Sequence, residues 1–318
     1  MHAPLVIFGF NRPDAMTRVL DNLSRCEDLT GGGARRGYVF IDGARGERDT
    51  DGVARTVGAV AGFRDRHFPR LEICARDVNF GCQRNIVTGL TEVLERHGRA
   101  IVIEDDVLVS RTFLTYLDAA LDAYERDGRI WCVNAWRDRT VRIPPDYGHD
   151  VYLTPRNMSW GWGTWNDRWK GVDFELKSWP AFRTREEDME RLRAAGRDLP
   201  GMLDAQFAGR LRTWDVQCSY HMVRNGLYAV EPRLALTKNI GSGTDCAHCD
   251  KEDIAVLTAR YYDFRPQLPD GLHADSRICD QFRDRGQRDP RRLHRLWKRI
   301  LLSWWKRGPR HDNPLACP

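Results

Sequence analysis

The sequence predicts an α/β protein built on a doubly wound, mainly parallel central sheet. Short apolar runs of strand length recur through the first half of the chain, and segments with helical apolar spacing separate them. Polar residues follow several of these runs at their carboxyl ends, where such sheets bind ligands. The composition, with 42% hydrophobic and 30% charged residues, is that of an ordinary globular protein.

Five apolar runs are the expected strands. They are Leu5–Phe10, Tyr38–Ile41, Leu71–Ala75, Ala100–Ile103 and Ile130–Val133. Three segments with apolar residues at helical spacing are the expected helices between them. These apolar residues are Met16, Val19, Leu20 and Leu23 after the first strand; Ile86, Leu90, Val93 and Leu94 after Gly81; and Phe113, Leu114, Leu117, Leu121 and Tyr124 after the fourth strand.

The second half of the chain is less regular and rich in tryptophan, with a short exposed helix expected over residues 186–195. A proline-rich stretch near residues 140–150 predicts a boundary between lobes. We therefore expect a first lobe over residues 1–145, a smaller second lobe over 146–287 and a basic tail over 288–318.

The fourth apolar run ends in three adjacent acids, Glu104, Asp105 and Asp106. Three carboxylates cannot all enter a core, because burying an unpaired carboxylate is very costly. Oxygen ligands of this kind suit Mg²⁺ or Mn²⁺, which often bind substrate phosphates as well. The alternative is a solvated turn that caps the next helix. Neither a G-x-G-x-x-G fingerprint nor a P-loop is present, which disfavours a dinucleotide or P-loop nucleotide site.

A resemblance to a known family starts at this triplet. The run Ala100–Phe113, together with Ile130–Asp138 and its W-C-V-N-A-W sequence, resembles the metal-binding region of the N-acetylglucosaminyltransferase I family and of related bacterial GT-A glycosyltransferases. A weaker likeness extends from Val6 to about Asp250. The resemblance implies a Rossmann-like GT-A fold and a hexosyl- or N-acetylhexosaminyltransferase. Its donor would be a nucleotide-diphosphate sugar, with a UDP-sugar as the first candidate, and its acceptor a glycan or lipid-linked hydroxyl.

The same resemblance implies roles for individual residues at the strand ends. Asp106 would bind Mn²⁺ or Mg²⁺, while Glu104 and Asp105 would contact the nucleoside and its ribose or steady the metal's water. Three further cofactor-binding residues are expected. Arg12 would lie near the nucleotide phosphates, Asp42 near the base and Arg84 near the diphosphate. The alternative for these last three is a capping or surface role.

Inverting sugar transfer requires a carboxylate that deprotonates the acceptor hydroxyl. Asp215, in the pair Trp214-Asp215, resembles the family's catalytic base, and inversion of the anomeric centre is inferred from this likeness. Asp204 is its nearest rival, and an Asp215 that caps a helix beside a core tryptophan is the alternative. Trp214 is counted with the substrate-binding residues.

Trp160, Gly161 and Trp162 resemble the family's glycine-aromatic loop beside the donor sugar. Aromatic faces pack on the C–H surfaces of sugars, and glycine allows close approach of the backbone. A tryptophan-rich core between the lobes is the alternative, and both can hold together.

His248 is a candidate second metal ligand, because many GT-A enzymes bring a late histidine to the metal. Zinc bound by Cys246, His248 and Cys249 is an alternative, although a second C-x-x-C is absent. The remaining alternative is that His248 is a surface histidine that binds no metal.

The net charge of +5 comes from the tail, because residues 288–310 contain nine Arg or Lys and one Asp. Over residues 291–307 the Leu, Ile and Trp residues follow one face of an amphipathic helix, which is typical of binding to an anionic membrane surface. Docking on the protein's own body or on a second subunit is the alternative. No nucleic-acid partner is expected, because the remaining chain has no extended basic run.

Nine cysteines and the lack of a recognisable signal peptide predict a cytoplasmic protein that is peripheral at the inner face of the membrane. Two other functions remain open at this stage. One is a nucleotidyltransferase acting on a sugar phosphate, although Gly9-Phe10-Asn11-Arg12 is a poor phosphate loop. The other is a non-enzymatic glycan-binding protein that uses the tryptophans.

Overall fold

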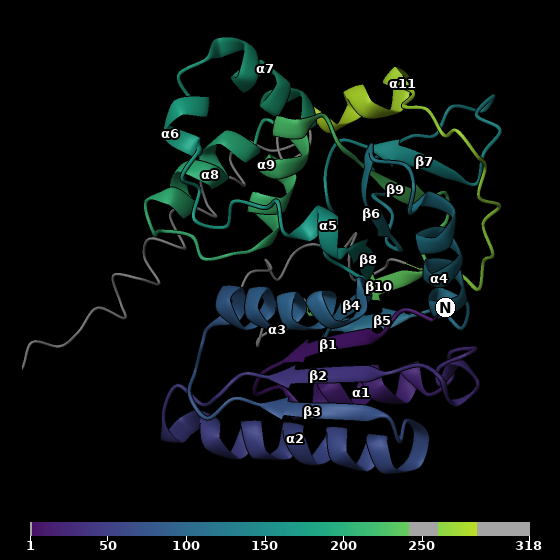
Figure 1. The fold of residues 1–318 in the computed structure, drawn as a ribbon, viewed down its shortest axis with the longest axis vertical. Helices are drawn as coiled ribbons and strands as arrows, with labels where there is room; N and C mark the ends of the chain where they lie inside the picture. Colours follow the sequence, from purple (N-terminus) through teal and green to yellow (C-terminus); the bar gives the residue numbers. More distant parts are fainter. Residues whose placement is uncertain (1, 242–259, 285–318) are drawn as a thin grey trace, which may run out of the picture.

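The computed structural model describes residues 2–241 and 260–284, and it has an α/β architecture (Figure 1). Its central sheet has eight strands in the order β3-β2-β1-β4-β8-β6-β9-β7, and β10 pairs with β5 in a second sheet. The strands are β1 Leu5–Gly9, β2 Gly37–Ile41, β3 Leu71–Ala75, β4 Arg99–Glu104, β5 Val107–Val109, β6 Ile130–Asn134, β7 Val151–Thr154, β8 Trp162–Trp165, β9 Tyr228–Pro232 and β10 Thr237–Asn239.

The helices follow the strands in alternation through the first half and gather in the second half (Figure 1). They are α1 Pro13–Leu23, η1 Gly31–Gly33, α2 Glu47–His67, α3 Cys82–His97, α4 Phe113–Tyr124, α5 Asn166–Trp169, α6 Trp179–Phe182, α7 Glu186–Ala195, α8 Leu199–Phe207, α9 Asp215–Asn225, α11 Ser276–Cys279 and η2 Asp280–Phe282.

The central sheet is mostly parallel. Strands β3, β2, β1 and β4 pair in parallel, and β6 and β9 run in the same direction, while β8 and β7 are antiparallel to their neighbours. Successive side chains of β1 alternate between two cores, with Leu5 and Ile7 on one face and Val6 and Phe8 on the other. Both faces are therefore apolar, as expected for a strand covered on two sides.

Helices cover both faces of the sheet. α1, α2 and α4 pack on the face that carries Leu5 and Ile7, and α3, α5 and α9 pack on the opposite face. This arrangement confirms the predicted fold class, a mostly parallel sheet flanked by helices. The five predicted strands and the three predicted helices of the first half are all present within a few residues of their expected bounds.

Helix α2 was not predicted from the sequence. It is 21 residues long, yet only Asp49, Thr56, Val60 and Phe63 are buried along it. Its apolar stripe is narrow, and glycines interrupt it, so the pattern of apolar residues at helical spacing is weak. Packing on α1 and on β2 and β3, rather than local propensity, therefore determines this helix.

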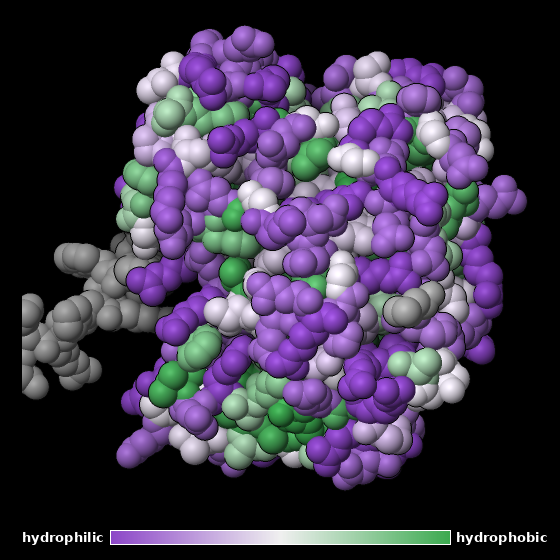
Figure 2. Space-filling model, in the orientation of Figure 1, coloured by the Kyte–Doolittle hydropathy of each residue, from purple (hydrophilic) through white to green (hydrophobic). Residues whose placement is uncertain are grey.

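The second half adds a helical layer, α6 to α9, with its own apolar core around Trp179, Phe182 and Tyr220. The predicted exposed helix over residues 186–195 is α7. The boundary near residue 145 stays a prediction, and residues on both sides of it contribute strands to the same sheet. The face drawn in Figure 2 is mainly hydrophilic, with apolar residues in scattered groups and a larger group in the lower part of the view.

Among the described residues, no helix is both long and apolar enough to cross a bilayer. The basic segment 288–310 and the expected amphipathic helix over 291–307 lie outside the described residues, as does His248. The predictions about the membrane surface and about a histidine ligand therefore stay predictions.

Candidate active site

The acidic triplet lies where β4 ends and turns into β5. Asp105 is buried, and both of its carboxylate oxygens accept hydrogen bonds from the Arg12 guanidinium. Oδ1 accepts from Nη2, and Oδ2 accepts from Nε at 3.3 Å. Arg12 Nη1 also lies 3.1 Å from Asp106 Oδ2. Because β1 and β4 are neighbours in parallel register, the residue that precedes helix α1 lies beside the end of β4. Arg12 is thus held between two of the three acids.

Negative charge exceeds positive charge at this cluster. Burial raises the pKa of Glu104 well above its usual range, and the charges of Asp106, Asp105 and Asp215 raise it further. Burial also raises the pKa of Asp105 to about 6, even though Arg12 opposes this shift. The Arg12 pKa itself is raised, because the carboxylates of Asp105 and Asp106 outweigh the effect of burial. One guanidinium therefore does not neutralise three carboxylates.

Strand β10, more than 130 residues further along the chain, approaches Asp106. It pairs antiparallel with β5, which places Asn239 opposite Val107. Asn239 Nδ2 donates to Asp106 Oδ1 at 3.2 Å, and the Ile240 N–H donates to the Asp106 carbonyl at 2.7 Å. Gly241 lies so close that a Cβ there would be 2.2 Å from Asp106 Oδ2. Asn239 is a candidate site residue that was not predicted, because the N-I-G-S-G sequence that it begins indicates only a loop.

Asp42 occupies the end of β2, where the sequence analysis expected it. Its carboxylate accepts from the N–H groups of Phe80 at 2.7 Å and Gly81 at 2.9 Å, and from Asn79 Nδ2 at 3.0 Å. These bonds hold the turn that begins α3. Arg84 lies in the first turn of α3 with its guanidinium 4.1 Å from the centre of the Phe80 ring. Base contact by Asp42 and diphosphate contact by Arg84 stay predictions.

Asp215 is the first residue of α9, and the Thr213 hydroxyl donates a hydrogen bond to its Oδ1. Its charge acts on Glu104 and on Cys82, so the fold brings the candidate base into electrostatic range of the acidic triplet. Its rival Asp204 is engaged elsewhere, because it accepts from Trp179 Nε1 at 3.1 Å and pairs with Arg183 at 3.0 Å. The choice of Asp215 over Asp204 as the base stays a prediction.

The tryptophans separate into a core group and a half-buried pair. Trp162 and Trp214 are buried and stack on each other with their centroids 5.3 Å apart, so their rings pack in the protein interior. Trp160 is half-buried and meets Trp136 edge to face at 4.8 Å. Gly161 has a φ of +88°, and a Cβ there would be 2.7 Å from Thr237 Cγ2 on β10. Of the aromatic residues expected to contact a sugar, Trp160 is the accessible one.

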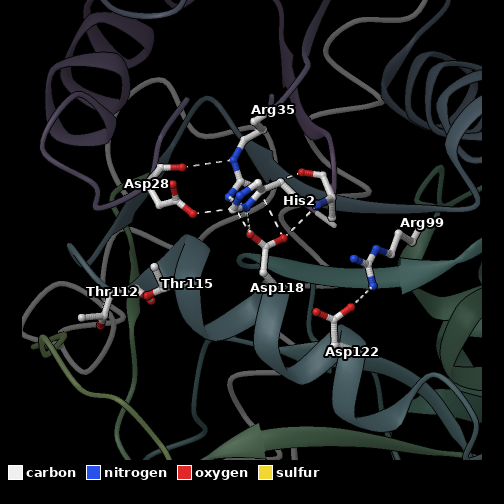
Figure 3. Close-up of polar contacts among 9 residues, drawn as sticks. His2, Asp28, Arg35, Arg99, Thr112, Thr115, Asp118 and Asp122 are labelled. Atoms are coloured by element: carbon white, nitrogen blue, oxygen red, sulfur yellow. Dashed lines mark hydrogen bonds and ion pairs between the residues drawn. The ribbon is translucent and has the colours of Figure 1, made fainter. Parts of the chain in front are cut away.

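A second arginine–acid cluster lies at the opposite edge of the sheet, before β1 begins. His2 Nδ1 lies 3.1 Å from Asp28 Oδ2 and 3.0 Å from Asp118 Oδ2, and these three side chains have the spacing of metal ligands (Figure 3). The buried guanidinium of Arg35 occupies the same space, donating to Asp118 at 2.6 Å and to the Ala3 carbonyl at 2.7 Å. Arg35 already supplies the cation, so this cluster is a poor metal site.

The acid triplet fits a divalent cation better. Glu104 and Asp106 offer carboxylate oxygens, the ligand type that Mg²⁺ and Mn²⁺ prefer, whereas the amide oxygen of Asn239 accepts the Gly241 N–H at 2.7 Å. The Asp106 side chain is 17% exposed, so an ion can reach it from solvent. A cation would offset the excess charge that raises the pKa of Glu104.

Comparisons with solved structures find partial similarity. S. aureus TarS, residues 1–349, is 12% identical over 76% of this chain, with a TM-score of 0.45, and this chain covers 61% of that one. The galactosyltransferase LgtC, with donor and acceptor analogues, is 12% identical over 71% of this chain and 72% of its own, with a TM-score of 0.38. The Pyrobaculum calidifontis mannosyltransferase PcManGT, in complex with GDP-Man and Mn²⁺, is 16% identical over 52% of this chain and 46% of its own, with a TM-score of 0.36.

No curated protein matches the chain. A family model does match, and its range of residues 65–181 covers a little over a third of the sequence. This range contains Arg84, the acidic triplet and the Trp160–Trp162 segment, but not Arg12, Asp42 or Asp215. Over residues 65–181 the chain is similar to the GNT-I family, which confirms the resemblance seen in its sequence.

Proposed function

We propose that the chain is a metal-dependent glycosyltransferase. It would transfer a hexosyl or N-acetylhexosaminyl group from a nucleotide-diphosphate sugar to a hydroxyl of a glycan or lipid-linked acceptor. The observation that carries this proposal is the excess of carboxylates at the carboxyl edge of a parallel sheet, with the separate carboxylate of Asp215 in electrostatic range. The match of residues 65–181 to the GNT-I family supports the same activity.

The donor diphosphate would lie against the acid cluster. Asp106 is the proposed ligand of Mn²⁺ or Mg²⁺, with Asn239 beside it and His248 as a further candidate from outside the described residues. A bound divalent ion would neutralise charge on the leaving diphosphate. Arg12, which Asp105 orients, would add a positive charge there, and Arg84 lies at the start of α3. Glu104 and Asp42 keep their proposed places beside the ribose and the base.

The acceptor would react on the side of Asp215. Its hydroxyl oxygen forms a bond to the anomeric carbon, and the bond from that carbon to the diphosphate oxygen breaks. The diphosphate takes the bonding electron pair, and the hydroxyl proton goes to the Asp215 carboxylate. Attack opposite the leaving group would invert the anomeric centre. Trp160, half-buried at the positive-φ turn of Gly161, would pack on a sugar face.

Donor turnover is the direct test of the function. The purified full chain is incubated with UDP-, GDP- and dTDP-sugars, with Mn²⁺, with Mg²⁺ or with EDTA, and release of the nucleoside diphosphate is measured. We expect release from one nucleotide class, with a divalent metal required. If no sugar nucleotide binds or turns over with either metal, the proposed function is wrong.

The role of Asp215 is tested with a matched pair of substitutions in the same helical layer. Asp215→Asn should lower kcat for transfer by about 10³-fold, within the range for loss of a general base. Asp204→Asn, which alters the rival acid, should leave kcat within about threefold of the wild type, because that acid contacts Trp179 and Arg183 instead. Full transfer activity in Asp215→Asn would reject the base assignment.

The basic tail supports an acceptor at a membrane surface. Residues 288–310 hold nine basic side chains and one acid, a charge pattern that anionic lipids attract. Removal of residues 288–318 should abolish co-sedimentation with anionic liposomes while donor turnover is retained. Unchanged liposome binding after this deletion would reject the membrane partner.

A further inference from the structure

A chain of hydrogen bonds leads from helix α3 to the candidate base. Gln83 on α3 accepts at Oε1 a hydrogen bond from Gln206 Nε2 at 3.0 Å. Gln206, in the last turn of α8, uses its own Oε1 to accept the Thr213 N–H at 2.9 Å. The Thr213 hydroxyl then donates to Asp215 Oδ1. Four residues from three separate segments are therefore joined, with Thr213 as the donor on both sides: its N–H donates to Gln206 and its hydroxyl donates to Asp215.

The segment between α8 and α9 needs such a connection, because it is otherwise an irregular loop. Gly209 has a φ of +69°, and the N–H groups of Arg210 and Leu211 both donate to the Ala205 carbonyl. These bonds close the end of α8 but do not extend as far as Asp215. The side chain of Gln206 spans the remaining distance to Thr213.

The hydrogen bond from Thr213 engages only one of the two carboxylate oxygens of Asp215, which suits a general base. It occupies Oδ1, and within residues 2–241 and 260–284 no side chain or backbone N–H is recorded as donating to Oδ2. A carboxylate with one oxygen held by a donor keeps the other available for an incoming hydroxyl.

We propose that Thr213 and Gln206 are positioning residues for Asp215. Thr213 orients the carboxylate through its hydroxyl, and Gln206 fixes Thr213 against α3, the helix that carries Arg84. The base on the acceptor side is thereby tied to the helix on the donor side. This inference rests on the proposed function.

Other charged and titratable groups also act on this carboxylate. They are Glu104 on β4, Cys82 on α3, Cys218 on α9 and Arg156 in the loop after β7, which pairs with Asp198 at 2.8 Å. None of these four is altered by substitution of Thr213 or Gln206. A fall in kcat on substitution of Thr213 therefore reports on its own bond to Asp215.

The test compares Thr213→Val, which removes the hydroxyl at nearly constant shape, with Thr213→Ser, which keeps it. Thr213→Val should lower kcat for transfer by about 10- to 100-fold, because a misplaced catalytic group loses effective orientation. The donor KM and the thermal midpoint of this variant should stay near wild type. Thr213→Ser should restore kcat to within about threefold.

Gln206→Met removes both amide bonds while keeping the length of the side chain, and its kcat should fall in the same direction by a smaller factor. Thr88→Val is the matched control, because the Thr88 hydroxyl donates only to backbone carbonyls within α3. Equal kcat for Thr213→Val and Thr88→Val would overturn the inference while leaving the proposed function intact. The absence of transfer in the wild type would instead reject the proposed function itself.

Discussion

The two edges of the sheet each carry an arginine among acids, and the two clusters differ in their charge balance. Before β1, Asp28 and Asp118 face two basic side chains, Arg35 and His2 (Figure 3). After β4, three adjacent acids face one guanidinium, that of Arg12. The first cluster has one guanidinium for two acids and is the better compensated, whereas the second has one guanidinium for three. Ligand-like spacing alone therefore does not identify a metal site, and the uncompensated charge is the better guide.

The two clusters also differ in what their arginines do. Arg35 is fully buried and ties the start of the chain to α4 and to the loop after α1. Arg12 is 26% exposed and lies beside the partly exposed carboxylate of Asp106. The compensated cluster should therefore contribute to stability and the uncompensated one to activity, and four experiments separate these contributions.

The largest expected effect is on activity. Asp106→Asn should lower metal-dependent donor turnover by about 10³-fold, because it removes a proposed metal ligand and its charge. The free energy of unfolding of this variant, measured in EDTA, should not fall. Retained turnover with an unchanged Mn²⁺ requirement would show that the metal binds elsewhere.

The next effect is on stability. Asp118→Ala should lower the free energy of unfolding by about 3 kcal/mol, because it leaves the buried Arg35 guanidinium without its carboxylate. Asp122→Ala, one turn further along α4, is the control: Asp122 is 56% exposed and pairs only with Arg99 in Figure 3. Its cost should be about 0.5 kcal/mol. Equal urea midpoints for the two variants would contradict the assigned role of the Arg35 cluster.

Metal addition should stabilise the fold through the triplet alone. At roughly 20 times its Kd, Mn²⁺ should raise the free energy of unfolding of the wild type by about 2 kcal/mol. Thermal unfolding with and without Mn²⁺ measures this gain. A variant with Asp28→Asn should keep it and Asp106→Asn should lose it, whereas the reverse pattern would assign the metal to the His2 cluster.

The smallest expected effect has the opposite sign to that of Asp118→Ala. In EDTA at pH 7.5, Glu104→Gln should raise the free energy of unfolding by about 1 kcal/mol, because it removes a carboxyl whose pKa is raised in the folded state. Such a group lowers stability as the pH rises above its unfolded pKa. The gain should therefore disappear near pH 4, where the carboxyl is protonated in both states. A loss of stability at pH 7.5 would mean that Arg12 compensates the triplet fully.

Much of the sheet could be predicted, because its strands are continuous apolar runs covered on both faces. The pattern of apolar residues did not predict α2, because only four of its 21 residues are buried. It also predicted little of the helices that follow β8. The triplet could be identified from the sequence, because three adjacent acids directly after an apolar strand form an unusual pattern. Asn239 was not identified, since nothing near it in the sequence indicates that β10 pairs with β5.

The exposure of the candidate site residues could not be predicted from the sequence, and the roles assigned to these residues stay predictions. Trp162 and Trp214, which the resemblance places beside a sugar, stack within the core, as the alternative of a tryptophan-rich core expects. Asp105 was expected at the nucleoside, and it is buried against Arg12. A sequence shows which side chains follow a strand, but the neighbouring strand determines which of them remain open to a ligand.

Residue types and local periodicity were sufficient to predict the fold class. They also showed the position of the acidic triplet and the cluster of basic residues after residue 288. Only the tertiary structure decided which arginine each acid meets, that β10 returns to Asp106, and that Thr213 and Gln206 connect Asp215 to α3. These contacts join residues far apart in the chain. Their partners are chosen by the packing of the whole sheet and its helices, which no local pattern records.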